Sequence, residues 1–235
     1  IEAYLKNAPE MVRYLASNFG VVYHNVPKYP DSYPDKPGGK AGWRSMQPVA
    51  FDAARLGDEF DNQRESFKGT LLMGRIAMDQ IEAHTLFSRG PGWVWLTVKM
   101  LLKYWFDLGW RRRTHRDRRL VLGQGMVAAL RYAMMQRNIP LQLQTGMETL
   151  VQDGDRITGI TVMKQGRRLR YGARHAVILA CGGFESNQQM REQYLARPTK
   201  VEWTAAPPIN HGDGIRAGQS AGAALDFMDM VWGSP

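Results

Sequence analysis

The chain has 235 residues, 44% hydrophobic and 23% charged, a composition typical of a folded globular protein rather than a disordered or fibrous one. Its formal net charge is +9, but much of the excess lies in one run, Arg111–Arg119. No RNP-like aromatic pattern, zinc-finger spacing or helix-turn-helix accompanies that run, so no nucleic-acid partner is expected. The single cysteine, Cys181, excludes an internal disulfide framework and a thiolate metal site, which favours a cytoplasmic location and no bound metal.

The first 48 residues contain a predicted helix, a short strand and a long loop. Helical spacing of Met11, Tyr14 and Leu15 predicts an amphipathic helix over residues 8–17, and Val21–His24 is typical of a strand. Residues 27–48 contain five prolines and three glycines, which exclude a regular element. Loops of this length are usually functional or disordered, and the tyrosines among the prolines favour function.

Residues 70–110 are predicted to be helical, and their last part is unusually rich in aromatic residues. Lys99, Lys103 and Asp107 interrupt the apolar stretch Trp93–Trp110, so a membrane-spanning helix is not expected. We expect a helix that faces the protein core. The alternative is a helix at a membrane surface, since tryptophans and the following arginines suit the headgroup region.

Residues 119–145 resemble a βαβ unit: a strand at 119–122, a turn at 123–125, a helix at 126–137 and a strand at 138–145. Gly123–Ala128 matches the dinucleotide pattern G-x-G-x-x-A. However, no acidic residue ends the second strand, where a ribose hydroxyl would need an acceptor. We therefore interpret these glycines as the start of a helix that packs close to the sheet.

A β-meander is predicted next, with strands at 149–152, 156–163 and 167–171. It leads to the short apolar run Ala176–Ala180, which is typical of a buried parallel strand and is followed by Gly182 and Gly183. Because open α/β sheets bind ligands at the carboxyl ends of their strands, this glycine pair predicts a site for a phosphate or a flat ring.

The segment Asn210–Ile215 places Asp213 between two glycines, just before a predicted small-residue helix at 216–225. Its carboxylate could accept a hydrogen bond from a ribityl or ribose hydroxyl, or it could cap the helix, and the two roles are compatible. His211 is interpreted as a loop residue. No Ser-His-Asp order, H-E-x-x-H, paired C-x-x-C or phosphate P-loop is present, so any chemistry would come from a cofactor.

Seven segments in order resemble the flavoproteins of the fumarate reductase and 3-ketosteroid Δ1-dehydrogenase superfamily, and specifically its ketosteroid-dehydrogenase-like branch. They are Pro9–Leu15, Pro30–Gly39, Asp117–Gly123, Val177–Glu185, Met190–Leu195, Trp203–Ala206 and Gly212–Ile215.

The resemblance implies an FAD-dependent enzyme that removes two hydrogens next to a ketone, the 1,2-desaturation of a 3-ketosteroid, with a hydride passing to the flavin and a tyrosine-type base taking the proton. It implies Tyr33 as the catalytic residue; position 32, where the family often has a second tyrosine, is Ser32. The FAD-binding residues that it implies are Ala180, Cys181, Gly182, Gly183 and Asp213, with Met147 near the adenine.

The expected fold class is therefore α/β: a partial Rossmann-like FAD-binding domain with a β-meander and a helical insertion. Residues 1–118 form its helical and loop-rich part, 119–228 its α/β part, and 229–235 the start of a substrate-binding domain. The chain starts at Ile1 without the family's N-terminal dinucleotide fingerprint. We interpret it as an internal fragment that, alone, binds FAD weakly and does not turn over.

The expected partner is a hydrophobic, steroid-like small molecule, with peripheral membrane contact left open and no prediction of oligomeric state. One alternative is a fumarate-reductase-like or tricarballylate-dehydrogenase-like flavoenzyme acting on small carboxylates. Another is a non-catalytic basic module that binds a membrane surface or nucleic acid through residues 93–119.

Overall fold

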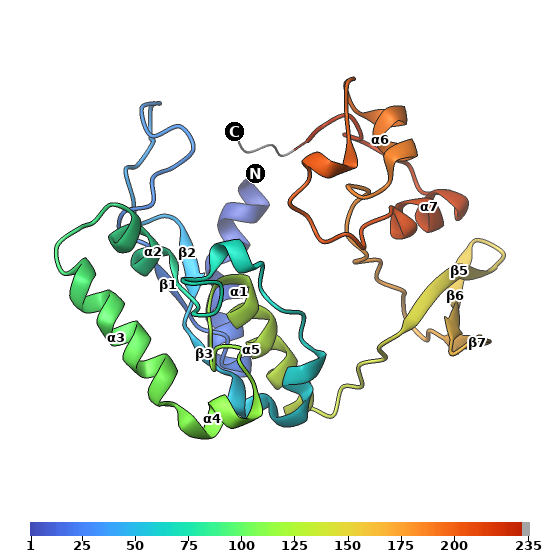
Figure 1. Ribbon diagram of the computed structural model, residues 1–235. Coiled ribbons are helices and arrows are strands. Elements are labelled where there is room, and N and C mark those ends of the chain that lie inside the picture. The colour runs from blue at the N-terminus through green and yellow to red at the C-terminus, as the bar shows by residue number, and fades with distance from the viewer. Residues whose placement is uncertain (232–235) are drawn as a thin grey trace. The chain divides into compact units, whose positions relative to one another are not determined.

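The computed structural model describes residues 1–231 (Figure 1). The chain divides into two compact units, unit 1 from Ile1 to Pro140 and unit 2 from Leu141 onward. The predicted domain limits at residues 118 and 228 remain predictions, and the last part of the predicted substrate-domain segment, 232–235, lies outside the described residues. Across residues 1–231, no helix combines the length and apolar character needed to cross a bilayer.

Unit 1 is mainly helical, and its strands are short. Its α-helices are α1 (Glu2–Phe19), α2 (Gln80–Phe87), α3 (Trp93–Phe106), α4 (Leu108–Arg113) and α5 (Leu122–Gln136), and its 3₁₀-helices are η1 (Ala53–Asn62) and η2 (Lys68–Thr70). Its strands form two antiparallel pairs, β1 (Tyr23–Asn25) with β2 (Met46–Pro48) and β3 (Phe51–Asp52) with β4 (Arg119–Leu120). The predicted first helix and the helical region are confirmed, and the predicted strand at 21–24 lies two residues later.

The core of unit 1 lies where β3, β4, η1 and α5 meet. It contains seven buried side chains: Phe51, Ala53, Leu56, Phe60, Trp110, Leu120 and Ala128. Phe60 and Trp110 pack in a tilted arrangement with ring centroids 5.2 Å apart, and the Trp110 ring nitrogen donates to the carbonyl of Arg116. These contacts fix the segment between α4 and β4 against the core.

The predicted βαβ unit at 119–145 is wrong. β4 pairs antiparallel with β3, the predicted turn glycines lie in the first turn of α5, and β5 begins only at Thr145. Pro140 has no backbone donor for a ladder. The interpretation of the glycines as a close packing contact is confirmed, because a Cβ on Gly125 would lie 2.8 Å from the carbonyl oxygen of Leu120.

Unit 2 consists of an antiparallel meander followed by short helices. The meander strands are β5 (Thr145–Asp153), β6 (Arg156–Lys164) and β7 (Arg167–Gly172), in spatial order β5-β6-β7. The helices are α6 (Gln188–Tyr194), η3 (Val201–Trp203) and α7 (Asp213–Ser220). The predicted meander and both of its turns are confirmed.

The predicted buried parallel strand at 176–180 is wrong for the structure described. These residues are extended but pair with no other strand among residues 1–231, and 89% of Ile178 is exposed. A central parallel strand needs neighbouring strands and a helical layer on each face to bury it. Unit 2 therefore combines helices with an antiparallel sheet, and the chain as a whole is a mixed helix and sheet protein.

Candidate functional site

A cavity of about 320 Å³ in unit 2 lies between β5 and α7. Its walls are Met147, Glu148, Thr149, Leu150 and Gln152 of β5 with Asp213, Arg216, Ala217, Ser220 and Ala221 of α7 and its C-terminal end. The β5–β6 register shifts between Met147 and Thr149. The cavity thus brings together Met147 and Asp213, two of the six predicted cofactor residues.

The predicted glycine segment, Cys181–Gly183, lies against the start of α7. The Gly212 amide donates to the carbonyl of Gly183 at 2.9 Å. A Cβ on Gly214 would lie 3.0 Å from Cys181 Cβ. These contacts therefore place Cys181, Gly182 and Gly183 beside the turn that carries Asp213. Ala180 directly precedes them in the chain.

Asp213 is the first residue of α7 and not its cap, so the predicted capping role is wrong. Gly212, with φ +80°, occupies the cap position, and no side chain caps the helix. The Asp213 carboxylate instead accepts from the Arg216 guanidinium at 2.6 Å, and about half of each side chain is exposed. Solvent-accessible carboxylate oxygens remain available to a hydroxyl donor at the mouth of the cavity.

A bound dinucleotide has to meet backbone at close range and place a ring system in a cavity. The glycine segment meets the first requirement, because residues 180–183 carry no bulky side chain and are largely exposed. The cavity beside Met147 has the size of small-molecule sites, which begin at roughly 300 Å³. These features fit an FAD adenosine and pyrophosphate moiety.

Tyr33 belongs to unit 1, where it lies in the loop that connects β1 and β2, and 70% of its surface is exposed. Asp31 organises this loop: its carboxylate accepts from the Lys40 amide at 2.9 Å and forms an ion pair with Arg44 at 3.1 Å. A Cβ on Gly39 would lie 2.6 Å from the Tyr33 carbonyl oxygen. The predicted functional loop is therefore an ordered segment that presents a phenol to solvent.

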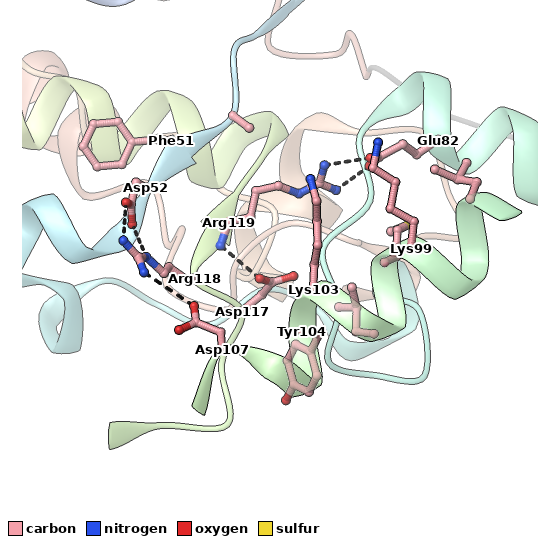
Figure 2. A pocket seen from close by; sticks show the side chains of 14 residues that line it. Phe51, Asp52, Glu82, Lys99, Lys103, Tyr104, Asp107, Asp117, Arg118 and Arg119 are labelled. Atoms are coloured by element: carbon pink, nitrogen blue, oxygen red, sulfur yellow. Dashed lines mark hydrogen bonds and ion pairs between the residues drawn. The ribbon is translucent and has the colours of Figure 1, made fainter. Parts of the chain in front are cut away.

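A second cavity, of about 350 Å³, lies within unit 1 and was not predicted from the sequence (Figure 2). Apolar side chains from β3, α3 and the segment before α2 form part of its wall, including Phe51, Ile76 and Met100. Charged side chains from four segments line the rest: Asp52, Glu82, Lys99, Lys103, Asp107, Asp117, Arg118 and Arg119. Because these positions share no periodicity or spacing, no sequence pattern could have grouped them.

Ion pairs hold the charged wall of this cavity together. Arg118 donates to both Asp52 carboxylate oxygens at 2.7 Å, and Arg119 donates to Glu82 at 2.7 Å. The hydrogen bond from Arg118 lowers the pKa of Asp52. Burial raises the pKa of Glu82, but hydrogen bonds from Arg119 and the Asp79 amide outweigh it, so the net shift is downward. Carboxylates held in the ionised form are poor proton donors near neutral pH. We therefore interpret this network as one that stabilises the fold and does not supply protons.

Comparison with known proteins identifies the family. The model of the FAD binding domain family matches residues 1–235. The 3-oxosteroid 1-dehydrogenase of Comamonas testosteroni is 38% identical over 93% of this chain and 38% of its own length. That of Mycobacterium tuberculosis strain H37Rv is 33% identical over 100% of this chain and 42% of its own length.

A solved structure shows the same fold. The 3-ketosteroid Δ1-dehydrogenase from Sterolibacterium denitrificans, crystallised with 1,4-androstadiene-3,17-dione, is 47% identical with a TM-score of 0.94. The match covers 98% of this chain and 42% of that one, so the chain spans about two fifths of the length of these relatives. The resemblance to ketosteroid-dehydrogenase-like flavoproteins is confirmed, and the chain belongs to the FAD binding domain family, whose cofactor is FAD.

Proposed function

We propose that this chain is the flavin-binding part of an FAD-dependent dehydrogenase that introduces a double bond next to the ketone of a 3-ketosteroid. The observation that carries the proposal is the likeness, at 47% identity and a TM-score of 0.94, to a structure crystallised with a steroid dienedione. The grouping of the glycine segment, Asp213 and Met147 within unit 2 supports it. When bound, FAD supplies the hydride acceptor.

The residues that would hold FAD all belong to unit 2. Ala180, Cys181, Gly182 and Gly183 offer backbone that a flat ring or a phosphate can approach without meeting a side chain larger than a thiol. Asp213 would accept a hydrogen bond from a ribityl or ribose hydroxyl, while Arg216, paired with it at 2.6 Å, would fix the carboxylate. Met147 would contribute an adaptable apolar surface for the adenine, as thioethers do elsewhere.

Tyr33 is the proposed proton acceptor of the reaction. Removing hydride from one carbon requires loss of a proton from its neighbour. An ionised tyrosine oxygen could take that proton and become a neutral phenol, while the adjacent ketone stabilises the developing charge. The hydrogen bond that the Lys40 amide donates to Asp31, together with the ion pair between Asp31 and Arg44, would keep the loop in one conformation. Ser32 offers only an aliphatic hydroxyl, which is far less acidic and less suited to this role.

A turnover assay on the full-length protein tests the proposal. With a 3-keto-4-ene steroid and an artificial electron acceptor, we expect formation of the conjugated 1,4-dien-3-one, which is followed by its ultraviolet absorbance. Tyr33→Phe should lower kcat by about a hundredfold or more, because it removes the base and leaves the ring.

Tyr29→Phe is the matched control, since Tyr29 lies in the same loop and is partly exposed, and it should retain activity. Turnover of dicarboxylates with none of steroids would contradict the steroid assignment. Full activity of Tyr33→Phe would remove Tyr33 from the mechanism while leaving the substrate class intact.

A hydrophobic steroid substrate partitions into bilayers, so peripheral contact of the protein with a membrane surface is part of the same proposal.

A further inference from the structure

The outward face of α3 in unit 1 is apolar along its whole length. Helical geometry places six side chains on one arc of this face, and all six are exposed: Val94, Trp95, Val98, Leu102, Trp105 and Phe106. We refer to them as the apolar stripe. Trp95 and Phe106 are 68% and 74% exposed, so their rings project into solvent and do not lie along the protein surface.

The opposite face of α3 already supplies the packing of the helix. Met100 and Tyr104 are buried in a cluster with Ile76 and Met78, and the Tyr104 hydroxyl donates to the carbonyl of His115 at 2.5 Å. A surface helix normally has a polar outer face, whereas a helix that is apolar on both faces is covered by a second apolar medium. The apolar stripe therefore marks an interaction surface separate from the core of unit 1.

The charges near the apolar stripe indicate what covers the outward face of α3. Residues 89–113 contain six basic side chains and one carboxylate, Asp107, which gives a formal charge of +5. Asp107 is engaged at the start of α4 and with Arg118 at 3.6 Å. Five of the cations have no ion-pair partner among residues 1–231: Arg89, Lys99, Lys103, Arg111 and Arg112. Arg111 donates to the carbonyl of Arg116 at 2.7 Å, which leaves Arg89, Lys99, Lys103 and Arg112.

These cations flank the apolar stripe along one side of α3 and, in the chain, before and after the helix. Lys99 and Lys103 border it on one side of α3, where they extend toward the second cavity (Figure 2). Arg89 precedes α3 in the chain, and Arg112 belongs to α4, which follows it. Exposed tryptophans flanked by cations match the chemistry of an anionic bilayer surface: the rings enter the boundary of the acyl chains while the cations meet the phosphates.

We propose that α3 lies in the surface plane of an anionic membrane, with the apolar stripe inserted and Arg89, Lys99, Lys103 and Arg112 at the headgroups. The helix is too short and too charged to span a bilayer, which agrees with a peripheral mode. This inference identifies the surface for the membrane contact proposed above and does not depend on the steroid reaction.

Vesicle sedimentation with the full-length protein tests the inference. Binding is expected to vesicles of phosphatidylcholine with phosphatidylserine, more strongly than to phosphatidylcholine alone, and to weaken as salt rises. The double variant Trp95→Gln/Phe106→Gln should lower binding to both vesicle types by at least about tenfold. Arg89→Gln/Arg112→Gln should lower binding only to the vesicles that contain phosphatidylserine.

Phe67→Gln is the matched control, because Phe67 is a 79% exposed aromatic residue of unit 1 outside α3, and it should bind as the parent does. Circular dichroism of each variant checks that it folds, and light scattering gives its mass. No binding to either vesicle type would overturn the inference. The inference would also be overturned if the parent protein is a dimer and Trp95→Gln/Phe106→Gln is a monomer, because a second copy of the chain would then cover the apolar stripe.

Discussion

Gly182 lies in the segment proposed to bind the flavin. Its backbone conformation and the lack of space beside it both favour glycine over any residue with a side chain. Its φ is +76°, and a Cβ there would lie 2.7 Å from Oδ1 of Asn210. The positive φ disfavours side chains by about 1–2 kcal/mol, and the lack of space would force the Asn210 side chain, three residues before Asp213, to move. A single residue thus connects the glycine segment to the start of α7.

Gly182→Ala should lower the stability of unit 2 and weaken FAD binding by at least about tenfold, because the new methyl group and the moved Asn210 side chain occupy the edge proposed to bind the cofactor. Gly154→Ala is the control: Gly154 also has a positive φ, +57°, but a Cβ there would meet nothing within 4 Å. It should lower stability and leave FAD affinity unchanged. Flavin fluorescence titration gives the affinity for FAD. Equal losses of affinity in the two variants would show that Gly182 has no specific role in binding the cofactor.

At the level of elements, ion pairs connect α2 to β4 in unit 1. Glu82 belongs to the capping box of α2 with Asp79, and it also binds Arg119 of β4, whose guanidinium donates to the Ala77 carbonyl at 2.7 Å. Asp117 accepts from the Ala77 amide at 2.8 Å. Asp117 and Arg119, about 40 residues later in the chain, therefore hold both the amide and the carbonyl of Ala77, just before α2.

The lowered pKa of Glu82 makes this connection dependent on pH. A carboxyl whose pKa is lower in the folded than in the unfolded protein stabilises the fold above its unfolded value, about 4.3, and loses that contribution as the pH falls through the folded-state pKa. Glu82→Gln should therefore lower the free energy of unfolding at neutral pH by about 1–3 kcal/mol. The loss should shrink as the pH falls below about 4.3 toward the folded-state pKa of Glu82, because the parent carboxyl then takes up a proton.

Urea unfolding at several pH values measures this effect, and glutamine at 82 keeps an oxygen for the Asp79 amide. Asp61→Asn is the control, because Asp61 pairs with Arg113 at 3.3 Å and 68% of its side chain is exposed, where ion pairs contribute little. A Glu82→Gln loss that is constant with pH would show that its charge is not responsible.

Local elements were predictable from the sequence, and long-range pairing was not. The meander was predicted because its strands and its Asp153-Gly154 and Gln165-Gly166 turns are local features. The strand predicted at 176–180 depends on neighbouring strands that its own residues do not specify, and β4 pairs with a segment 68 residues earlier. Likewise, the proximity of Met147 and Asp213 was reached only through the family resemblance, while the cavity in unit 1 had no sequence signal.

At the scale of the whole molecule, the two units supply different parts of the proposed reaction. Unit 2 carries the proposed FAD contacts, and unit 1 carries Tyr33 and the apolar stripe. The relatives are more than twice as long as this chain.

The central claim, that bound FAD accepts a hydride from a 3-ketosteroid, is tested most directly by anaerobic flavin reduction. The full-length protein, loaded with FAD, is mixed with a 3-ketosteroid without any electron acceptor while the visible flavin absorbance is recorded. We expect the flavin band to bleach with the steroid and to stay unchanged with succinate, and Tyr33→Phe to slow bleaching while retaining FAD. A flavin that bleaches with succinate and is unaffected by the steroid would contradict the account.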